Sequence, residues 1–210
     1  MPSHSDALND HVGAVVSHLQ MSYLSDSPAL FASASAALAK LRRAIGSSPG
    51  ADPTVWEVMF ADWPTELHSS SDDPTLDERA AHAALTLYAL HQQSKRQSRM
   101  HRGGRSLGLA VGELSRTMAT PDAVRRRFDA LSTAGGFREV LHHGRGLVTQ
   151  LRGADISLDY GLLASHLRRL QRPQTADQIR LRWARDFYRR PPSAGPTPPS
   201  KPTSIEGEPA

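Results

Sequence analysis

Five basic side chains crowd one stretch of the chain that contains no acidic residue. The segment SKRQSRMHRGGRSLG spans residues 94–108, includes His101, and carries Lys95, Arg96, Arg99, Arg102 and Arg105. Ammonium and guanidinium groups of this kind bind phosphates. Because like charges repel one another, such a run indicates a polyanionic partner.

Charge is segregated along the whole chain. Residues 1–94 hold 4 Lys or Arg and 11 Asp or Glu, whereas residues 95–190 hold 20 and 8. The genome's codon usage can explain why arginine is commoner than lysine, but it cannot separate the two signs of charge. The basic half therefore favours nucleic acid as the partner.

Several classes of protein are excluded. The chain has no cysteine, which rules out disulfides, thiolate chemistry and cysteine-ligated metal sites. The pair His142-His143 does not predict a metal site, because adjacent helical residues diverge by about 100°. No nucleophile with an ordered base can be assembled, so we expect neither an enzyme nor a cofactor. The polar start and the lack of a long apolar run predict a cytoplasmic protein with no membrane contact.

The apolar spacing is helical nearly throughout. Helix starts are predicted at Ser27-Pro28, at the capping box of Thr75 and Glu78, and at Thr120-Pro121. A second capping box, Thr175 with Gln178, is expected before QIRLRWARDFYRR. Further boundaries are a helix end at Gly46 and a break at Gly135-Gly136. The segment VWEVMF is expected to be a helix in preference to a strand.

The prediction is an all-α bundle of about eight or nine helices. Gly103-Gly104 divides it into an acidic helical half, residues 1–103, and a basic helical half, residues 104–190. Residues 191–210 contain seven of the fifteen prolines and predict a disordered tail. The glycines at 104, 108 and 112 are more consistent with close helix packing than with phosphate binding, and all three tryptophans are expected in the core.

Arginines are predicted to form ridges beside the buried faces of the basic helices. In residues 137–152, Arg138, Arg145 and Arg152 lie within about 40° of one another, beside an apolar stripe, and His142 joins them. In residues 121–131, Arg126 points outward and is flanked by Arg125 and Arg127. Arg182, Arg185 and Arg189 form a third ridge. The alternative is that each ridge is a solvated face paired with local acids, but 8 acids cannot neutralise 20 bases.

These segments, in this order, resemble the CasB family, the small subunit of the type I-E CRISPR Cascade complex. The resemblance covers about residues 80–190 and is most specific at MHRGGRSLG and LDYGLLASHL. It implies an all-helical, non-catalytic subunit, present in more than one copy, that helps hold guide RNA and opened target DNA beside other Cascade subunits. The family's basic positions match Lys95, Arg96, Arg99, Arg102, Arg105, Arg127, Arg138, Arg145 and Arg169. Together with Arg126, these nine make ten residues that are predicted to bind nucleic acid. This chain departs from the family by its proline-rich tail and its additional arginines.

Two alternatives stay open. FDALSTAGGFREVLHH has two helices joined by a short glycine turn, as in a helix-turn-helix regulator, although few groups near the start of its second helix suit base edges. A pure scaffold would instead pair its arginines with acidic faces of neighbouring subunits, including a second copy of itself.

Overall fold

The computed structural model describes residues 4–189, and this part of the chain contains nine α-helices and no β-strand. The helices are α1 (His4–Leu24), α2 (Pro28–Arg43), α3 (Trp56–Phe60), α4 (Leu76–Gln92), α5 (Leu107–Thr117), α6 (Pro121–Ser132), α7 (Phe137–Gly153), α8 (Tyr160–Leu170) and α9 (Pro173–Tyr188). Two short 3-10 helices, Pro53–Val55 and Thr65–Leu67, flank α3. The predicted all-α class is confirmed. The tail predicted to be disordered, residues 191–210, lies outside the described residues.

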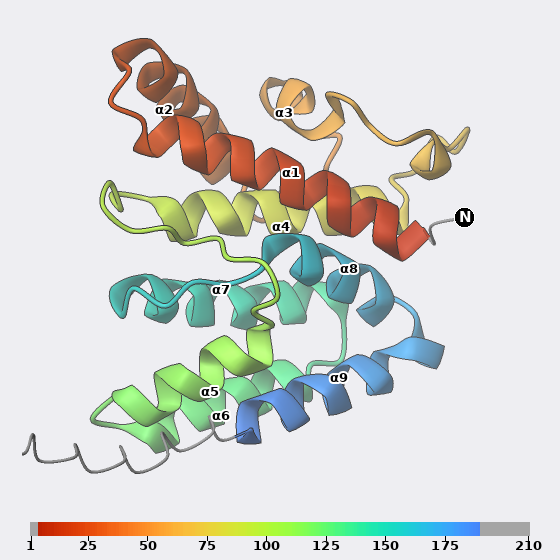
Figure 1. Cartoon of the computed structure of the whole chain (residues 1–210). Coiled ribbons are helices and arrows are strands. Elements are labelled where there is room, and N and C mark those ends of the chain that lie inside the picture. The colour runs from red at the N-terminus through yellow and green to blue at the C-terminus, as the bar shows by residue number, and fades with distance from the viewer. Residues whose placement is uncertain (1–3, 190–210) are drawn as a thin grey trace, which may run out of the picture.

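The helices stack in layers (Figure 1). Helices α1 and α2 lie on one side of α4, α7 and α8 lie on its other side, and α5, α6 and α9 form the far end. Helix α8 packs on both α1 and α4, and a single hydrophobic cluster runs from Leu8 to Phe187. The acidic and basic halves of the sequence therefore share one core.

Most helix starts lie where the sequence predicts them. The amide of Glu78 donates to Thr75 Oγ1 at 3.1 Å, and the amide of Thr75 donates to Glu78 Oε2 at 2.7 Å, so the predicted capping box is present. Proline begins α2 and α6 as expected. VWEVMF is helical, since it completes the first 3-10 helix and forms α3.

The capping box predicted at Thr175 and Gln178 is wrong. Helix α9 begins earlier, at Pro173, because proline has the backbone angle of a first helical turn and needs no hydrogen bond there. Thr175 therefore lies inside the helix, and its hydroxyl donates to the Arg169 carbonyl at 2.6 Å. Gln178 accepts from the Arg169 side chain at 2.7 Å.

The buried faces of the basic helices follow their predicted stripes. Val124, Phe128 and Leu131 of α6 are buried, as are Ile179, Trp183 and Phe187 of α9. Along α7 the buried residues are Val140, Gly144, Leu147, Val148 and Leu151. Helix α4 differs from its predicted single stripe, because 13 of its 17 residues are buried. Helices α1, α2, α7 and α8 all pack against it and cover every side.

Close packing explains two of the glycines. A Cβ atom on Gly108 would collide with the Trp183 carbonyl oxygen, and one on Gly112 would lie 2.5 Å from the Phe187 carbonyl oxygen. These glycines let α5 approach α9, as the sequence favoured. Of the tryptophans, Trp183 is a core residue, but the prediction is wrong for Trp56, which is 42% exposed and donates its indole N–H to the Pro49 carbonyl.

None of the helices within residues 4–189 combines the length and hydrophobicity needed to cross a lipid bilayer.

Candidate nucleic-acid interface

The basic segment after α4 folds around one buried amide side chain. Gln92 is fully buried, and its Nε2 donates to the carbonyls of Lys95 at 2.6 Å and Ser98 at 2.9 Å. Its Oε1 accepts from the amide of Met100 at 3.2 Å. Three hydrogen bonds to one side chain fix the path of residues 93–100. We call residues 93–106 the basic loop.

The second part of the basic loop is clamped to the segment before α8. The amide of Leu158 donates to the Met100 carbonyl at 3.0 Å, and the amide of Arg102 donates back to the Leu158 carbonyl at 3.1 Å. Asp159 accepts from the amide of Gly104 at 2.6 Å, where the positive φ of 77° suits glycine. The loop is therefore a built element rather than a loose connection.

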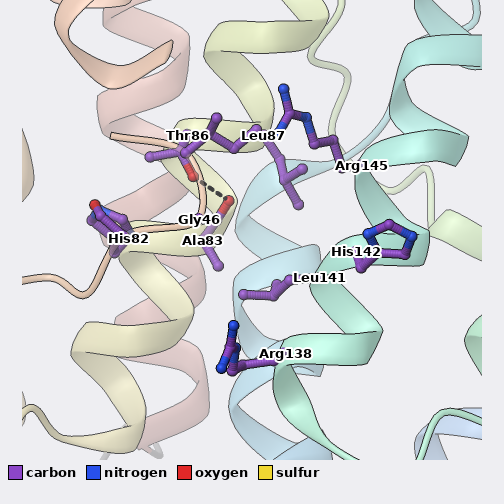
Figure 2. Close-up of a pocket in the computed structure, with 11 residues that line it drawn as sticks. Gly46, His82, Ala83, Thr86, Leu87, Arg138, Leu141, His142 and Arg145 are labelled. Atoms are coloured by element: carbon purple, nitrogen blue, oxygen red, sulfur yellow. Dashed lines mark hydrogen bonds between the residues drawn. The ribbon is translucent and has the colours of Figure 1, made fainter. Parts of the chain in front are cut away.

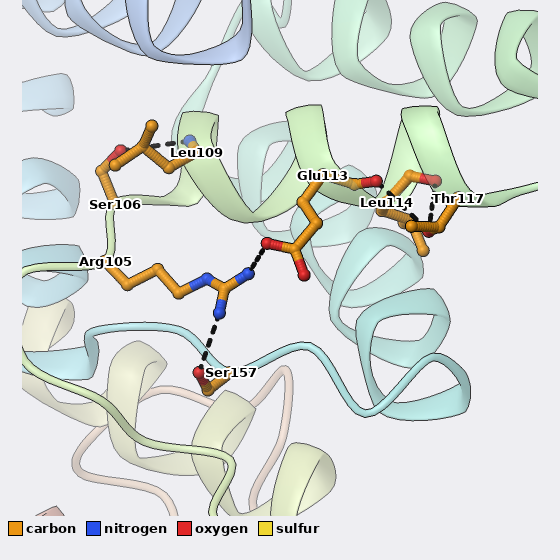
Figure 3. A network of polar contacts seen from close by, with 7 residues as sticks. All are labelled: Arg105, Ser106, Leu109, Glu113, Leu114, Thr117 and Ser157. Atoms are coloured by element: carbon orange, nitrogen blue, oxygen red, sulfur yellow. Dashed lines mark hydrogen bonds and ion pairs between the residues drawn. The ribbon is translucent and has the colours of Figure 1, made fainter. Parts of the chain in front are cut away.

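Four of the ten predicted binding residues have partners within the protein. Lys95 forms an ion pair with Asp155 at 2.8 Å, and Arg169 donates to Gln178. Arg105 pairs with Glu113 and donates to Ser157 Oγ at 3.4 Å, which ties α5 to the segment before α8 (Figure 3).

The fourth, Arg96, lies against aromatic rings. Its guanidinium carbon is 3.9 Å from the centre of the Phe31 ring and 5.5 Å from that of Tyr23, and its Nη1 donates to the Tyr23 carbonyl. A cation over two rings and a carbonyl bond join the loop to α1 and α2.

The remaining six predicted residues are exposed. Within residues 4–189 none of their side chains forms an ion pair with a carboxylate. They are Arg99 and Arg102 on the basic loop, Arg126 and Arg127 on α6, and Arg138 and Arg145 on α7.

Helix α7 brings three of these six together. Arg138 and Arg145 line the same hollow beside α4 (Figure 2). Arg127 reaches across from α6, so that a Cβ atom on Gly146 would lie 3.4 Å from its Nη1. We call Arg127, Arg138 and Arg145 the α7 edge.

The C-terminal end of α7 contacts the start of the basic loop. At the end of α7, Arg152 donates to Gln93 Oε1 at 2.9 Å, and two residues beyond the helix Asp155 pairs with Lys95. Arg152 was predicted to lie on the same ridge as Arg138 and Arg145, and it does lie on this helix, but it is partly buried and has a structural partner.

Carboxylates neutralise few of the charges in the basic half. Residues 95–189 contain 19 Lys or Arg, and four of them, Lys95, Arg105, Arg168 and Arg180, form ion pairs in the described chain. Several acids are engaged otherwise: Glu139 faces His143, and Asp186 accepts from Ser106. The other 15 basic side chains of residues 95–189 therefore form no ion pair with a carboxylate of the described chain.

Four buried or half-buried histidines add no positive charge at pH 7. Burial lowers the pKa of His91 to about 3 and that of His166 to about 4, and it also lowers the pKa of His82 and of His101. These imidazoles are neutral at pH 7 and serve the core.

One feature near the α7 edge was missed by the sequence reasoning. A hollow of about 210 Å³ lies between α4, α7 and the segment after α2, residues 45–47. Its parts come from three stretches far apart in the chain, so no local motif signals it. The buried His82 was the only unusual residue that could have pointed to it.

Comparison with known proteins agrees with this architecture. The family model described as CRISPR-associated protein Cse2 matches residues 37–188. The chain belongs to the Cse2 family. The crystal structure of CasB from Thermobifida fusca is 36% identical to this Cse2 chain, covers 87% of it and 98% of its own length, and superposes with a TM-score of 0.72. The resemblance inferred from the sequence is thereby confirmed.

Two further structures share the fold. A chain of a CRISPR RNA-guided surveillance complex is 22% identical, with a TM-score of 0.64 over 86% of this Cse2 chain and 92% of its own length. A Cse2-family protein of Thermus thermophilus is 25% identical, with a TM-score of 0.60 over 86% of this Cse2 chain and 97% of its own length. Among curated protein sequences, none matches the chain.

Proposed function

We propose that this chain is a non-catalytic subunit of an RNA-guided CRISPR surveillance complex in antiviral defence. In that complex it grips the backbones of guide RNA and of opened target DNA, including the displaced strand. One observation carries the proposal: the guanidinium groups of Arg127, Arg138 and Arg145 are exposed around one helix and meet no carboxylate in residues 4–189. The shared fold with a chain of a surveillance complex supports the setting.

The mechanism is electrostatic. In RNA-guided complexes, base pairing with the guide selects the sequence, so this subunit needs only to hold backbones. Exchange of a DNA duplex for a guide–target duplex is nearly balanced in free energy. A few phosphate contacts on a single strand therefore shift the balance toward the open state.

The partners follow from the same charges. Other subunits of the complex and a second copy of this chain are the protein partners, and the acidic half, residues 1–103, of one copy faces the basic half, residues 104–190, of the next. Arg99 and Arg102 on the basic loop, with Arg126 on α6, supply further cationic contacts to strands or neighbours. The protein works in the cytoplasm, without a cofactor.

The test is strand binding by a charge-reversed α7 edge. Arg138→Glu with Arg145→Glu changes the charge by −4 without touching an ion pair in the described structure. We expect at least a tenfold loss of affinity for a single-stranded oligonucleotide in fluorescence anisotropy, with an unchanged helical circular dichroism spectrum.

The control is a pair with the same charge change elsewhere. Arg116→Glu with Arg185→Glu alters two exposed arginines on α5 and α9, and it should cost much less affinity. Equal losses in both variants would show a general charge effect and discard the α7 edge. Preference for one duplex sequence would support a helix-turn-helix regulator, and no binding by the wild type would support a scaffold.

A further inference from the structure

The hollow beside the α7 edge has walls of two kinds. Arg138 and Arg145 extend from two turns of α7, about 10 Å apart along the helix axis, and the side chain of Leu141 lies between them (Figure 2). Opposite, Ala83 and Leu87 of α4 form an apolar floor. We call this hollow the α4–α7 pocket.

The pocket is cationic. None of its lining residues is a carboxylate, and Arg138 and Arg145 are both exposed. His82, which lines it from α4, is 4% exposed, and burial lowers the pKa of its imidazole. The positive charge of the pocket therefore comes from the two arginines.

The size of the pocket selects the ligand. At about 210 Å³ the pocket is smaller than the roughly 300–1,000 Å³ usual for ligand sites, so it suits a single small ligand. An apolar floor suits the face of a ring, and arginine side chains both stack on bases and hold phosphates. Together these features match one nucleoside phosphate.

The geometry points to the α4–α7 pocket as a site for one unpaired nucleoside phosphate, with the base over Ala83 and Leu141 and the phosphate held by Arg138 and Arg145. This inference rests on the proposed function, because the nucleotide belongs to a strand held on the α7 edge. It adds to that function a contact with the base itself, which backbone binding does not require.

The experiment compares two strands of equal length and charge. One is an ordinary single-stranded oligonucleotide, and the other carries abasic sugar–phosphate units throughout. Wild-type protein should bind the base-containing strand about tenfold more tightly at the same salt concentration, the effect of burying one base. The variant Ala83→Met fills the pocket, and it should lose that preference while binding the abasic strand as the wild type does.

Two further variants keep the test decisive. Ala36→Met places the same side chain in the separate groove between α1 and α2, and it should leave the preference intact. Leu141→Ala removes the apolar side chain between the two arginines, and it should reduce the preference even if Ala83→Met does not fold. Adenosine monophosphate alone is the second arm: its binding to the wild type and not to Ala83→Met would show that an isolated nucleotide suffices, whereas a strand-only preference requires the attached backbone.

Equal binding of both strands by the wild type, or an unchanged preference in both pocket variants, would overturn the inference. Neither result would touch the proposed function, which would fail if the wild type bound neither strand.

Discussion

The basic loop and helix α7 carry similar residues and use them differently. In the loop, Lys95, Arg96 and Arg105 hold other parts of the protein: a carboxylate after α7, two aromatic rings, and the carboxylate of Glu113 on α5. On α7, Arg138 and Arg145 are exposed and meet no carboxylate in the described chain. A run of basic residues in a sequence can therefore anchor other parts of the protein or stay exposed, and only the contacts in the structure distinguish the two uses.

The difference arises from backbone geometry. A helix holds its own backbone hydrogen bonds, so the side chains on its outer face are free for a ligand. A loop must satisfy its polar groups through the rest of the protein, and here Gln92 and Asp159 do so. Long arginine side chains in such a loop become part of its anchorage.

Acid should have the largest effect, because it destabilises the packing under the basic loop. His91 lies under the loop with its Nδ1 2.8 Å from the Tyr160 hydroxyl, and burial lowers its pKa to about 3 and that of His166 to about 4. The unfolded chain binds protons near pH 6.5, so stability is full above that pH and falls as the pH drops toward the folded pKa values. Between pH 7 and 5 each histidine should cost about 2 kcal/mol, measured by urea unfolding. A flat profile would contradict neutral buried imidazoles.

Removal of the loop's central anchor should have the next largest effect. Gln92→Ala deletes four hydrogen bonds in a fully buried site, three to the loop and one from the Tyr88 hydroxyl, and we expect a loss of about 3 kcal/mol in the free energy of unfolding. Amide hydrogen exchange should rise in residues 93–106 and stay unchanged in α7. Uniform exchange across both regions would show that the loop has no separate anchorage.

A pair of single arginine variants sharpens the comparison within the loop. Arg96→Ala should cost about 2 kcal/mol of stability, because it removes a cation from two rings and a bond to a carbonyl. Arg99→Ala, three residues away on the exposed side, should leave stability within about 0.5 kcal/mol. Thermal unfolding of both variants tests this. Equal losses of stability in the two variants would mean that exposure does not separate anchoring arginines from exposed ones.

Much of the fold could be predicted because local rules govern helices. Apolar periodicity gave the buried faces of α6, α7 and α9, and the Thr75–Glu78 box gave the start of α4. Where two local rules competed, as at Pro173 and Thr175, the proline determined the start. The burial of 13 of the 17 residues of α4 could not be seen locally, because four other helices pack against it.

The site was less predictable than the fold. Helical phase correctly placed Arg126, Arg138 and Arg145 on exposed faces. It could not reveal that Lys95 meets Asp155, since that contact joins residues 60 positions apart. The same limit hid the α4–α7 pocket, whose three walls meet only after folding.

The most direct test of the central claim is the salt dependence of strand binding. If about six phosphates are neutralised, log K should fall against log salt with a slope near −4. Neutralising two arginines of the α7 edge, with Arg138→Gln and Arg145→Gln, should reduce that slope to about −2.8. An unchanged slope in this variant would mean that the strand never touches the α7 edge, and the account of this helix as the gripping surface would be wrong.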